Sequence, residues 1–551
     1  MIRSNHQDFS SDGALLAETF GLPLLSYLCA SPEEAVDRRL RSDQRLRDAQ
    51  EQVLTDLLEL ARHLATDATQ GGVPRYLRLE VLARYDEVYG TSTGNALRVQ
   101  AGGDIDISVP DDPASGPLVV LLRDSYPLLL VPIGQRLGQE LGLTTATWSN
   151  PRRRSFESAV LRDEDLSRLF VEETDSGGWM SNIYRSTGAG GSVQLSMLAN
   201  TLLLNAWRQV ALGSATPDRE TLAQKLVDLV DLLRTAARGE PAEVKAFVAF
   251  AGVVFDGVDS LDLPFGTLRP STQHESDSAP TSLEGAVSAT TEQGGTITAS
   301  YAGDLVLETT MSYQIRVERF DSAPSLPPPD WPSDLRDFER LQVHVETVGL
   351  ASLLPCANDD VVPSPMTSTW RLVFDPLAWG PLFSWSDARS RPSWAPRSMN
   401  ASEAEEFRLW AQRINSERRP SFDVAIRRTL SAAGARTDPQ DSLVDLVIAW
   451  ENLLGSRQGE PTLRVSAALG WLLASDSDAR EEVRGQAAKI YALRSDVVHG
   501  NRAVPPEEAT EALQRARRMT VSALRMLFDQ RTDLLSLRGG DDRSRALIMG
   551  G

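Results

Sequence analysis

The stretch that decides the fold of the C-terminal part of this chain is Tyr491-Ala492-Leu493-Arg494-Ser495-Asp496-Val497-Val498-His499-Gly500. It closes a helical pattern that begins near residue 479, and a glycine at such a position is a common helix stop. The stretch also joins an arginine, which stays cationic, to a histidine, whose ordinary pKa of about 6.5 allows proton transfer near neutral pH. It therefore predicts a helix ending in two groups suited to acid–base work on a phosphate.

Helical pattern continues on both sides of this stretch, in segments joined by short connections. We expect helices at residues 401–415, 421–433, 441–454, 462–474, 479–499 and about 505–530, the last one beginning at Pro505-Pro506. These helices predict an all-α bundle over residues 400–531. Residues 416–531 hold 17 Lys and Arg against 16 Asp and Glu, whereas the whole chain has a net charge of −20. Because the residues outside 416–531 are acidic, we do not expect the chain to coat nucleic acid over its whole length.

The other residues predict a multidomain α+β protein, since 551 residues suffice for several cores. We expect a helical region at 1–96, a mixed α/β region at 97–240, a β-rich region at 241–395 and a tail at 532–551. Helices are predicted within 22–64, with a cap at Ser31-Pro32, and at 193–212 and 219–237. Short apolar runs predict strands at 105–109, 118–122, 128–131, 246–255, 296–301, 305–317, 341–348 and 370–374. Residues 271–282 and 324–332 are expected as surface loops, and 379–394 as coil.

The sequence lacks the usual signatures of several functional classes. No apolar segment is long enough to span a membrane, and the N-terminus lacks a signal-peptide core, so we expect a cytoplasmic protein. Cys29 and Cys356 lie far apart and the five histidines are scattered, so neither a disulfide, a metal site nor a cofactor is expected. There is no Gly-x4-Gly-Lys-Ser/Thr loop and no Gly-x-Ser-x-Gly turn.

Spacing alone does not single out Arg494 and His499, because Arg269 and His274 repeat the same interval. On a regular helix, five residues turn through about 500°, which leaves Arg494 and His499 about 140° apart. We therefore expect a helix kinked within the motif, a site shared by two copies of the chain, or both.

Three polar neighbours and one residue of an adjacent helix are candidates for supporting this pair. Ser495 and Asp496 lie four and three residues before the histidine, where they could hold the imidazole. Tyr491 lies three residues before the arginine, against which it could pack. Glu451 is a lone carboxylate in an apolar helix, and we expect it to pair with an arginine.

Four blocks in order carry a resemblance to a known family. They are Ala425-Ile426-Arg427-Arg428, Trp450-Glu451-Asn452-Leu453-Leu454, Leu463-Arg464-Val465-Ser466 and the stretch 491–500. Residues 407–530 thereby resemble the Apea-like branch of the HEPN superfamily. The resemblance implies a metal-independent endoribonuclease that acts as a homodimer in a toxin, abortive-infection or antiviral role. It also implies that Arg494 and His499 are the catalytic residues.

The chemistry of RNA agrees with that implication, because the 2′-hydroxyl can serve as the nucleophile. A histidine suits the proton transfers and an arginine suits the charge of the phosphorane. The expected products carry a 2′,3′-cyclic phosphate and a 5′-hydroxyl.

Two other functions stay open. One is a HEPN module that binds RNA or dimerises without cleaving. The other is a DNA-binding regulator acting through residues 22–64, although Glu33, Glu34 and Asp37 would then face phosphates. The arginine set Arg515, Arg517, Arg518 and Arg525 is expected either along an RNA path or on a solvated helix face.

Overall fold

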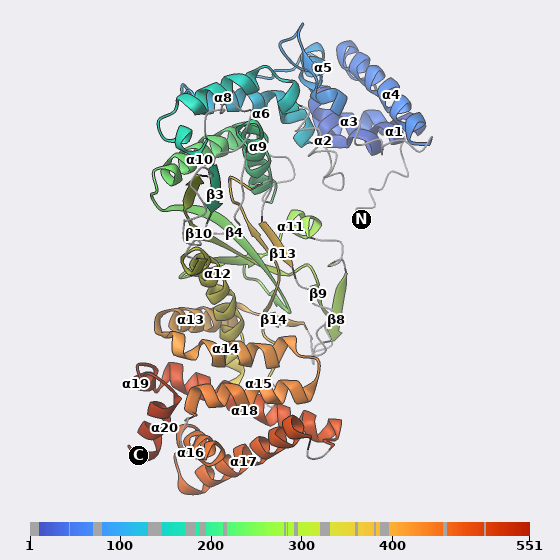
Figure 1. Cartoon of the computed structure of the whole chain (residues 1–551). Helices are drawn as coiled ribbons and strands as arrows, with labels where there is room; N and C mark the ends of the chain where they lie inside the picture. The colour runs from blue at the N-terminus through green and yellow to red at the C-terminus, as the bar shows by residue number, and fades with distance from the viewer. Residues whose placement is uncertain are drawn as a thin grey trace.

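The computed structural model is an elongated α+β protein, with helices at both ends and sheets between them (Figure 1). It describes residues 10–42, 44–69, 80–130, 146–170, 182–186, 194–212, 218–279, 283, 285–290, 296–319, 331–358, 362–378, 382–385, 396–455, 460–500 and 503–550. Predicted features at 324–330, 379–381 and 386–394 lie outside the described residues.

The N-terminal region is helical, as predicted. Its elements are α1 (Ser11–Phe20), α2 (Leu22–Leu28), α3 (Glu33–Arg41), α4 (Asp48–Thr69) and α5 (Thr93–Gln100), with a small pairing of β1 (Tyr85–Asp86) and β2 (Thr91–Ser92). Pro32, rather than Ser31, is the residue that caps α3, and it makes no side-chain cap hydrogen bond.

The strands predicted at 105–109, 118–122 and 128–131 are wrong. Residues 118–122 and 128–129 belong to α6 (Ser115–Leu129), and residues 105–109 form no regular element. Leu118, Val119, Leu121 and Leu122 are all buried, and so are Asp124 and Ser125, so α6 is buried on nearly every side. Such a helix has no exposed polar face, and its short apolar runs look like those of a buried strand.

The rest of this second region is also mainly helical. It contains α8 (Arg152–Arg162), the 3-10 helix η4 (Leu166–Leu169), α9 (Leu195–Ala211), α10 (Arg219–Ala237) and the strand β3 (Asn182–Ser186). The helices predicted at 193–212 and 219–237 are thus confirmed. Asn205 of α9 donates a hydrogen bond to the backbone carbonyl of Asp375 at 3.2 Å, and the Tyr313 hydroxyl donates to the Asp375 carboxylate at 2.8 Å, which ties α9 to the sheet.

The central region is built on a six-stranded antiparallel sheet with the order β13-β12-β4-β10-β7-β6. Its strands are β4 (Ala242–Ala251), β6 (Leu261–Leu263), β7 (Gly266–Pro270), β10 (Leu305–Tyr313), β12 (Thr367–Val373) and β13 (Leu382–Trp385). Smaller pairings join β5 (Val253–Phe255) to β14 (Arg397–Met399), β8 (Ala286–Thr290) to β9 (Thr296–Ser300), and β11 (Ile315–Arg319) to β3. The strands predicted at 246–255, 296–301, 305–317 and 370–374 are therefore confirmed in outline, while β13 corrects the coil expected over 382–385.

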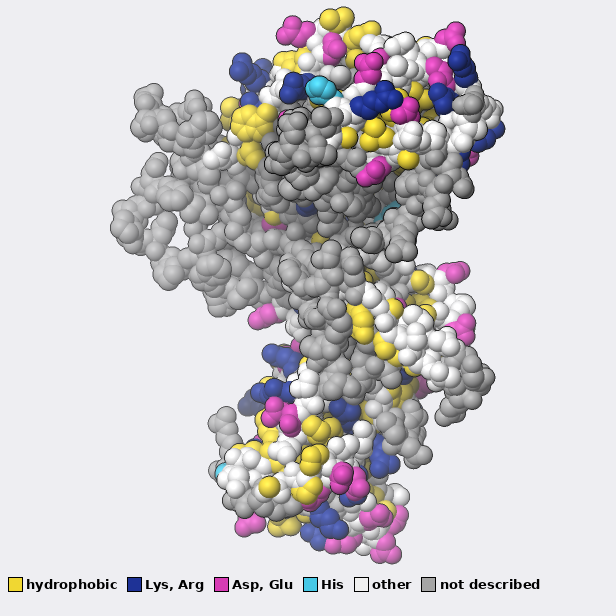
Figure 2. All heavy atoms as spheres, turned by 90° about the vertical axis from the view of Figure 1, so that its right-hand side faces the viewer, with side chains coloured by type: hydrophobic (Ala, Val, Ile, Leu, Met, Phe, Trp, Pro, Cys, Tyr) yellow, Lys and Arg dark blue, Asp and Glu magenta, His cyan; other side chains and the backbone are white. Residues whose placement is uncertain are grey.

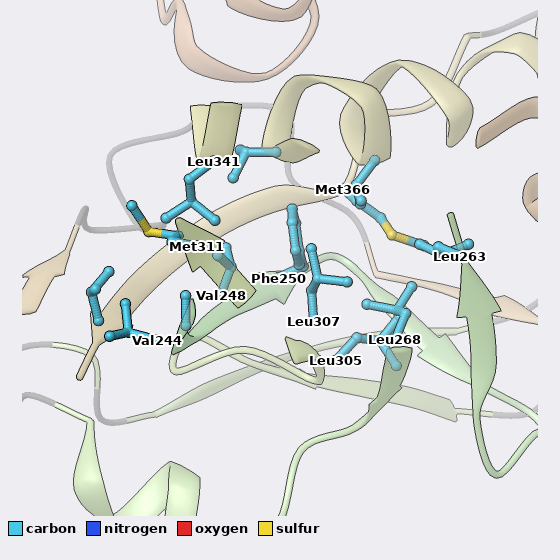
Figure 3. Close-up of a cluster of buried hydrophobic side chains, with 14 of the residues drawn as sticks. Val244, Val248, Phe250, Leu263, Leu268, Leu305, Leu307, Met311, Leu341 and Met366 are labelled. Carbon is cyan, nitrogen blue, oxygen red and sulfur yellow. The ribbon is translucent and has the colours of Figure 1, made fainter. Parts of the chain in front are cut away.

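One face of the sheet packs against α12 (Trp331–Ala351). Val248 and Phe250 of β4 and Leu307 of β10 meet Leu341 of this helix in one buried cluster (Figure 3). The strand predicted at 341–348 is wrong, because these residues lie in α12. Leu341, Val345 and Val348 are buried at a spacing of four and three residues, so one helix face carries them. The same segment also alternates apolar and polar residues at its start, which is why its pattern resembles that of a strand.

Part of the loop expected at 271–282 is helical. Residues Gln273–Ser278 form α11, begun by a capping box in which Thr272 and Glu275 bond each other's backbone N–H groups. Arg269 of β7 donates two hydrogen bonds to Glu275, at 2.7 and 2.9 Å. Arg269 is therefore a structural residue, as expected for a coincidental Arg-x4-His match.

The C-terminal bundle has the predicted helices. They are α13 (Ala401–Glu417), α14 (Asp423–Leu430), α15 (Pro439–Leu454), α16 (Pro461–Leu473), α17 (Ser477–His499) and α18 (Pro506–Asp529), with short helical turns at Pro420–Phe422 and Ser431–Ala435. In the core, Trp450 of α15 donates a hydrogen bond from its indole nitrogen to Thr520 of α18 at 2.8 Å. The helices predicted for this region are thus confirmed. Helices alone do not assign the region to a family.

The predicted tail at 532–551 is wrong over most of its length. Residues 532–549 form α19 (Thr532–Leu535) and α20 (Gly540–Met549), and α20 packs on α15 and α16. Arg543 of α20 is fully buried and donates hydrogen bonds to the carbonyls of Leu453 and Asn452 at 2.7 and 2.9 Å. These carbonyls belong to the last turn of α15, so the bundle extends beyond residue 531.

A buried ion cluster joins the bundle to the sheet. Glu346 of α12 lies 2.5 Å from Arg418, which follows α13, and Arg418 also lies 2.8 Å from Asp423 of α14. Both members of the first pair are nearly inaccessible, with side chains 4% and 6% exposed. Breaking such a pair leaves an uncompensated buried charge, so α12 is held firmly against α13 and α14.

Candidate active site

The predicted motif lies at the end of α17, which forms an antiparallel hairpin with α16. Asp476 caps the start of α17 by accepting a hydrogen bond from the Ala479 N–H at 2.9 Å. Gly500 ends it in the left-handed conformation, with φ 64° and ψ 27°, and donates its N–H to the Asp496 carbonyl. The helix is continuous through the motif, so the kink that would bring Arg494 and His499 onto one face is not present.

Arg494 lies on the inward side of α17. Ala487, Ile490 and Tyr491, which precede it by seven, four and three residues, are all buried. Arg494 itself is half-buried, and its Nε has no hydrogen-bond partner in the part of the chain that the structure describes. Within those same residues it forms no ion pair, so its charge is not committed to a carboxylate.

His499 lies about 140° around the same helix end from Arg494 and is exposed. The single chain therefore does not bring Arg494 and His499 together, as the 140° separation predicts for a regular helix. Among the described residues, no hydrogen bond joins His499 to Ser495 or to the side chain of Asp496, so the predicted support for the imidazole is not seen.

Tyr491 and Glu451 form a contact between α17 and α15. The Tyr491 hydroxyl donates a short hydrogen bond to Oε1 of Glu451. Burial, followed by the hydrogen bond and charge of Glu451, raises the pKa of the Tyr491 phenol well above its ordinary value, while the nearby charge of Arg494 partly opposes this rise. The prediction that Glu451 pairs with an arginine is corrected, because its partner is a phenol.

This contact joins the carboxylate of Glu451, on α15, to the phenol of Tyr491, which lies three residues before Arg494 on α17. The negative charge of Glu451 is satisfied by the Tyr491 hydroxyl rather than by Arg494. The guanidinium thus keeps donors for another anion, and Tyr491 fixes the turn of helix that carries it.

The four arginines of α18 divide into two kinds. Arg517 is 7% exposed and donates to the Ala432 carbonyl at 2.6 Å, so it is a structural residue and lies neither on an RNA path nor on a solvated face. Arg515, Arg518 and Arg525 line one hollow of about 630 Å³ between α16, α17 and α18.

Sequence reasoning missed the other polar residues of this hollow, which are Gln486 of α17, Ser522 and Asp529 of α18, and Gln530 at the end of α18. The available signal was the helical stripe 515, 518, 522, 525 and 529, whose members recur every three or four residues on α18.

The N-terminal helices offer little to DNA. In α3, Arg39 lies 2.7 Å from Glu51 and Arg41 lies 3.0 Å from Asp37, so two of its cations are already paired. Basic and acidic side chains are interspersed over both ends of the visible face (Figure 2). On this face, such mixing does not form the positive surface that duplex binding needs.

Two further searches of the described residues gave negative results. No group of three or more His, Cys, Asp or Glu is arranged to hold a metal ion. No helix in the described ranges combines the length and the hydropathy needed to cross a membrane.

Comparison with known proteins identified no relatives: no family model, no curated protein and no solved structure matches this chain. The HEPN resemblance therefore rests on the residues of the four blocks and on the helices that carry them.

Proposed function

We propose that the chain is a metal-independent endoribonuclease of the HEPN type, acting in the cytoplasm as a homodimer in a toxin, abortive-infection or antiviral role. The observation that carries the proposal is Arg494, a half-buried arginine with no carboxylate partner among the described residues, on the same helix end as the exposed His499. A structural arginine at such a place is usually paired, whereas one that binds a substrate phosphate must keep its donors free.

The reaction follows from these two side chains and the RNA. His499 accepts the proton of the 2′-hydroxyl, whose oxygen attacks the adjacent phosphorus. Arg494 stabilises the charge that develops on the phosphorane oxygens. Cleavage of the bond to the 5′-oxygen, which takes up a proton, gives a 2′,3′-cyclic phosphate and a 5′-hydroxyl.

The separation of the two side chains within one chain calls for a second copy. In a two-fold dimer the same helix end of each copy faces the other, so Arg494 of one chain can act with His499 of its partner. The two histidines can then divide the work, one accepting the first proton and one supplying the last.

The same separation favours a second candidate function, a HEPN module that binds RNA or dimerises without cleaving. In that case Arg494 and His499 need never meet, and both would be replaceable without loss of activity.

Cleavage assays on the purified full-length chain distinguish the two candidates. Total RNA is incubated with the protein in EDTA, and the fragments are tested for 5′-hydroxyl ends by direct labelling with polynucleotide kinase. The proposal expects cleavage by the wild type, and a loss of at least a hundredfold in both Arg494→Ala and His499→Ala.

A matched control is His274→Ala, which alters the second Arg-x4-His pair and should leave cleavage unchanged. Intact RNA with the wild type, or equal cleavage by wild type and His499→Ala, would favour the non-cleaving module. Sequencing RNA 5′ ends after expression of wild type and His499→Ala would then locate the cleavage sites in cells.

A further inference from the structure

The hollow beside α18 is lined by three arginines, Arg515, Arg518 and Arg525. It has a volume of about 630 Å³, within the range of about 300–1,000 Å³ typical of ligand sites. Its walls come from the end of α16 at Leu473, from Gln486 of α17 and from the stripe of α18 that includes Arg515, Arg518 and Arg525.

The three arginines are held differently, and this decides what each can do. Arg525 is fixed by donating to the carbonyls of Leu354 and Pro355, both at 3.1 Å. Arg515 forms an exposed pair with Glu511 at 3.0 Å, an interaction that a stronger anion can displace. Arg518 is half-buried and forms no ion pair within the described part of the chain.

The acidic residue of the hollow is already neutralised. Asp529 lines its far end, but its carboxylate pairs with Arg413 of α13. Arg515 and Arg525 also have carboxylates nearby, Glu511 at 3.0 Å and Glu406 at 4.0 Å, so Arg518 is the arginine of the hollow whose charge has no ion-pair partner among the described residues, which favours an anionic ligand there.

The remaining lining suits a nucleobase. Met519 and Leu473 supply apolar surface next to the arginines, and Gln486 supplies an amide that can both donate and accept hydrogen bonds. A positively charged groove that follows the backbone is one of the means by which proteins hold single strands.

The position along α17 links the hollow to the motif. Gln486 precedes Arg494 by eight residues, which corresponds to about 12 Å along the helix axis. A strand bound in the hollow can therefore continue along α17 to the helix end.

We propose that this hollow binds the phosphates of single-stranded RNA, with Arg518 as the principal contact and Arg515 as a second. This inference rests on the proposed ribonuclease function, because it treats the hollow as the place where the substrate strand is held away from the reacting phosphate. Arg518 and Arg515 are binding residues in this account and take no part in the chemistry.

The test uses a probe that cannot be cleaved. A fluorescein-labelled single strand of ten 2′-O-methyl nucleotides lacks the nucleophile, so its binding to the full-length protein is measured by anisotropy at several salt concentrations. Arg518→Ala should weaken binding about tenfold and reduce the dependence of log K on log salt by about 0.7, the value for one phosphate contact of a single strand. The double variant Arg515→Ala/Arg518→Ala should reduce the dependence of log K on log salt by about 1.4.

The matched control is Arg545→Ala, which removes an exposed arginine of α20 that pairs with Asp541 four residues away, as Arg515 pairs with Glu511. This variant should bind like the wild type. An unchanged affinity and salt dependence in Arg518→Ala would overturn the proposal.

Two further arms distinguish a strand site from a mononucleotide site, and strand binding from cleavage. Competition by adenosine monophosphate as strong as competition by the ten-nucleotide strand would overturn the assignment to a strand and indicate a mononucleotide site. Binding that depends on Arg518, in a protein that leaves ordinary RNA intact, would uphold this inference while refuting the nuclease. Cleavage that depends on His499, together with binding that does not depend on Arg518, would support the nuclease and refute this inference.

Discussion

Replacing Arg543 by leucine should loosen the end of α15 by about 3 kcal/mol. This side chain is fully buried and donates to the carbonyls of Leu453, Asn452 and Leu537, at 2.7, 2.9 and 3.3 Å. Its guanidinium carbon also lies 4.3 Å from the centre of the Phe422 ring. Burial lowers its pKa to about 10, and the charge of Asp542 opposes that effect, so the group remains cationic at neutral pH.

The magnitude follows from these contacts. The last carbonyls of a helix have no partner within the helix, and a buried carbonyl left without a donor costs about 1–3 kcal/mol. The Leu453 bond is buried and the other two are partly buried, so about 2–4 kcal/mol is lost with the hydrogen bonds and about 1 kcal/mol with the ring contact. Relief of the cost of burying the charge offsets part of this loss, which leaves about 3 kcal/mol.

Hydrogen exchange is the suitable assay, because a chain of this size does not unfold as one unit. Amides near the end of α15 should exchange roughly a hundredfold faster in Arg543→Leu, since each 1.4 kcal/mol corresponds to a factor of ten. Arg545→Ala, on the same helix but exposed and paired with Asp541, is the control. Exchange of α15 within about threefold of wild type would show that α20 is a dispensable appendage and refute the reasoning.

Three further predictions concern the site and the bundle. Mixing Arg494→Ala with His499→Ala should restore about a quarter of wild-type cleavage if one arginine and the opposite histidine form a shared site, because half of randomly formed dimers are mixed and each rebuilds one site; no recovery would indicate either that both residues act within one chain or that each reaction needs both histidines. Burial alone would raise the pKa of Asp445, but hydrogen bonds from Arg436, Arg428 and Ser431 hold it below its ordinary value. Its stabilising effect should therefore be complete at neutral pH and disappear as the pH falls below about 4, so Asp445→Asn should be less stable than wild type at pH 7 and lose less on acidification in a thermal melt. In Gly540→Ala, the added carbon would lie 2.7 Å from backbone atoms of Gly455, so exchange of α20 should accelerate, whereas Gly539→Ala, with no atom within 4 Å of its added carbon, should behave like wild type.

Local signals explain why the bundle was predictable. Pro461 and Pro506 stand at the first positions of α16 and α18, and Gly500 ends α17 in a left-handed conformation that favours glycine. Each of these signals acts within one or two turns and needs no information about the rest of the chain. The amphipathic spacing between them then fixes the lengths of the helices.

Tertiary context accounts for the errors. Residues 341–346, in the second half of α12, alternate apolar and polar residues well enough for a strand, and the helical period emerges only when Leu341, Val345 and Val348 are seen against the sheet. Arg543 resembles a solvated charge on a short helix, because the carbonyls that need it belong to α15, about ninety residues earlier. Neither relation can be read from the neighbouring residues.

The candidate site was predictable only along α17 itself. The sequence locates Arg494 and His499 on one helix and predicts their angular separation, since both follow from the helical repeat. The contact between Tyr491 and Glu451 crosses from α17 to α15 and corrects the expected partner of Glu451.

The proposed dimer would use the tip of α17 as its contact surface. Relative to Arg494, the helical repeat puts Val498 at about 40°, Ser495 at about 100° and His499 at about 140°, so these four residues share one arc of the last turns. Val498 is 48% exposed within that arc, although aliphatic side chains are usually buried. A second copy related by a two-fold axis would cover Val498 with its own counterpart and bring each arginine toward the opposite histidine. Such a dimer would account both for Arg494, which has no ion-pair partner among the described residues, and for the exposed valine, and the mixed-variant experiment tests it directly.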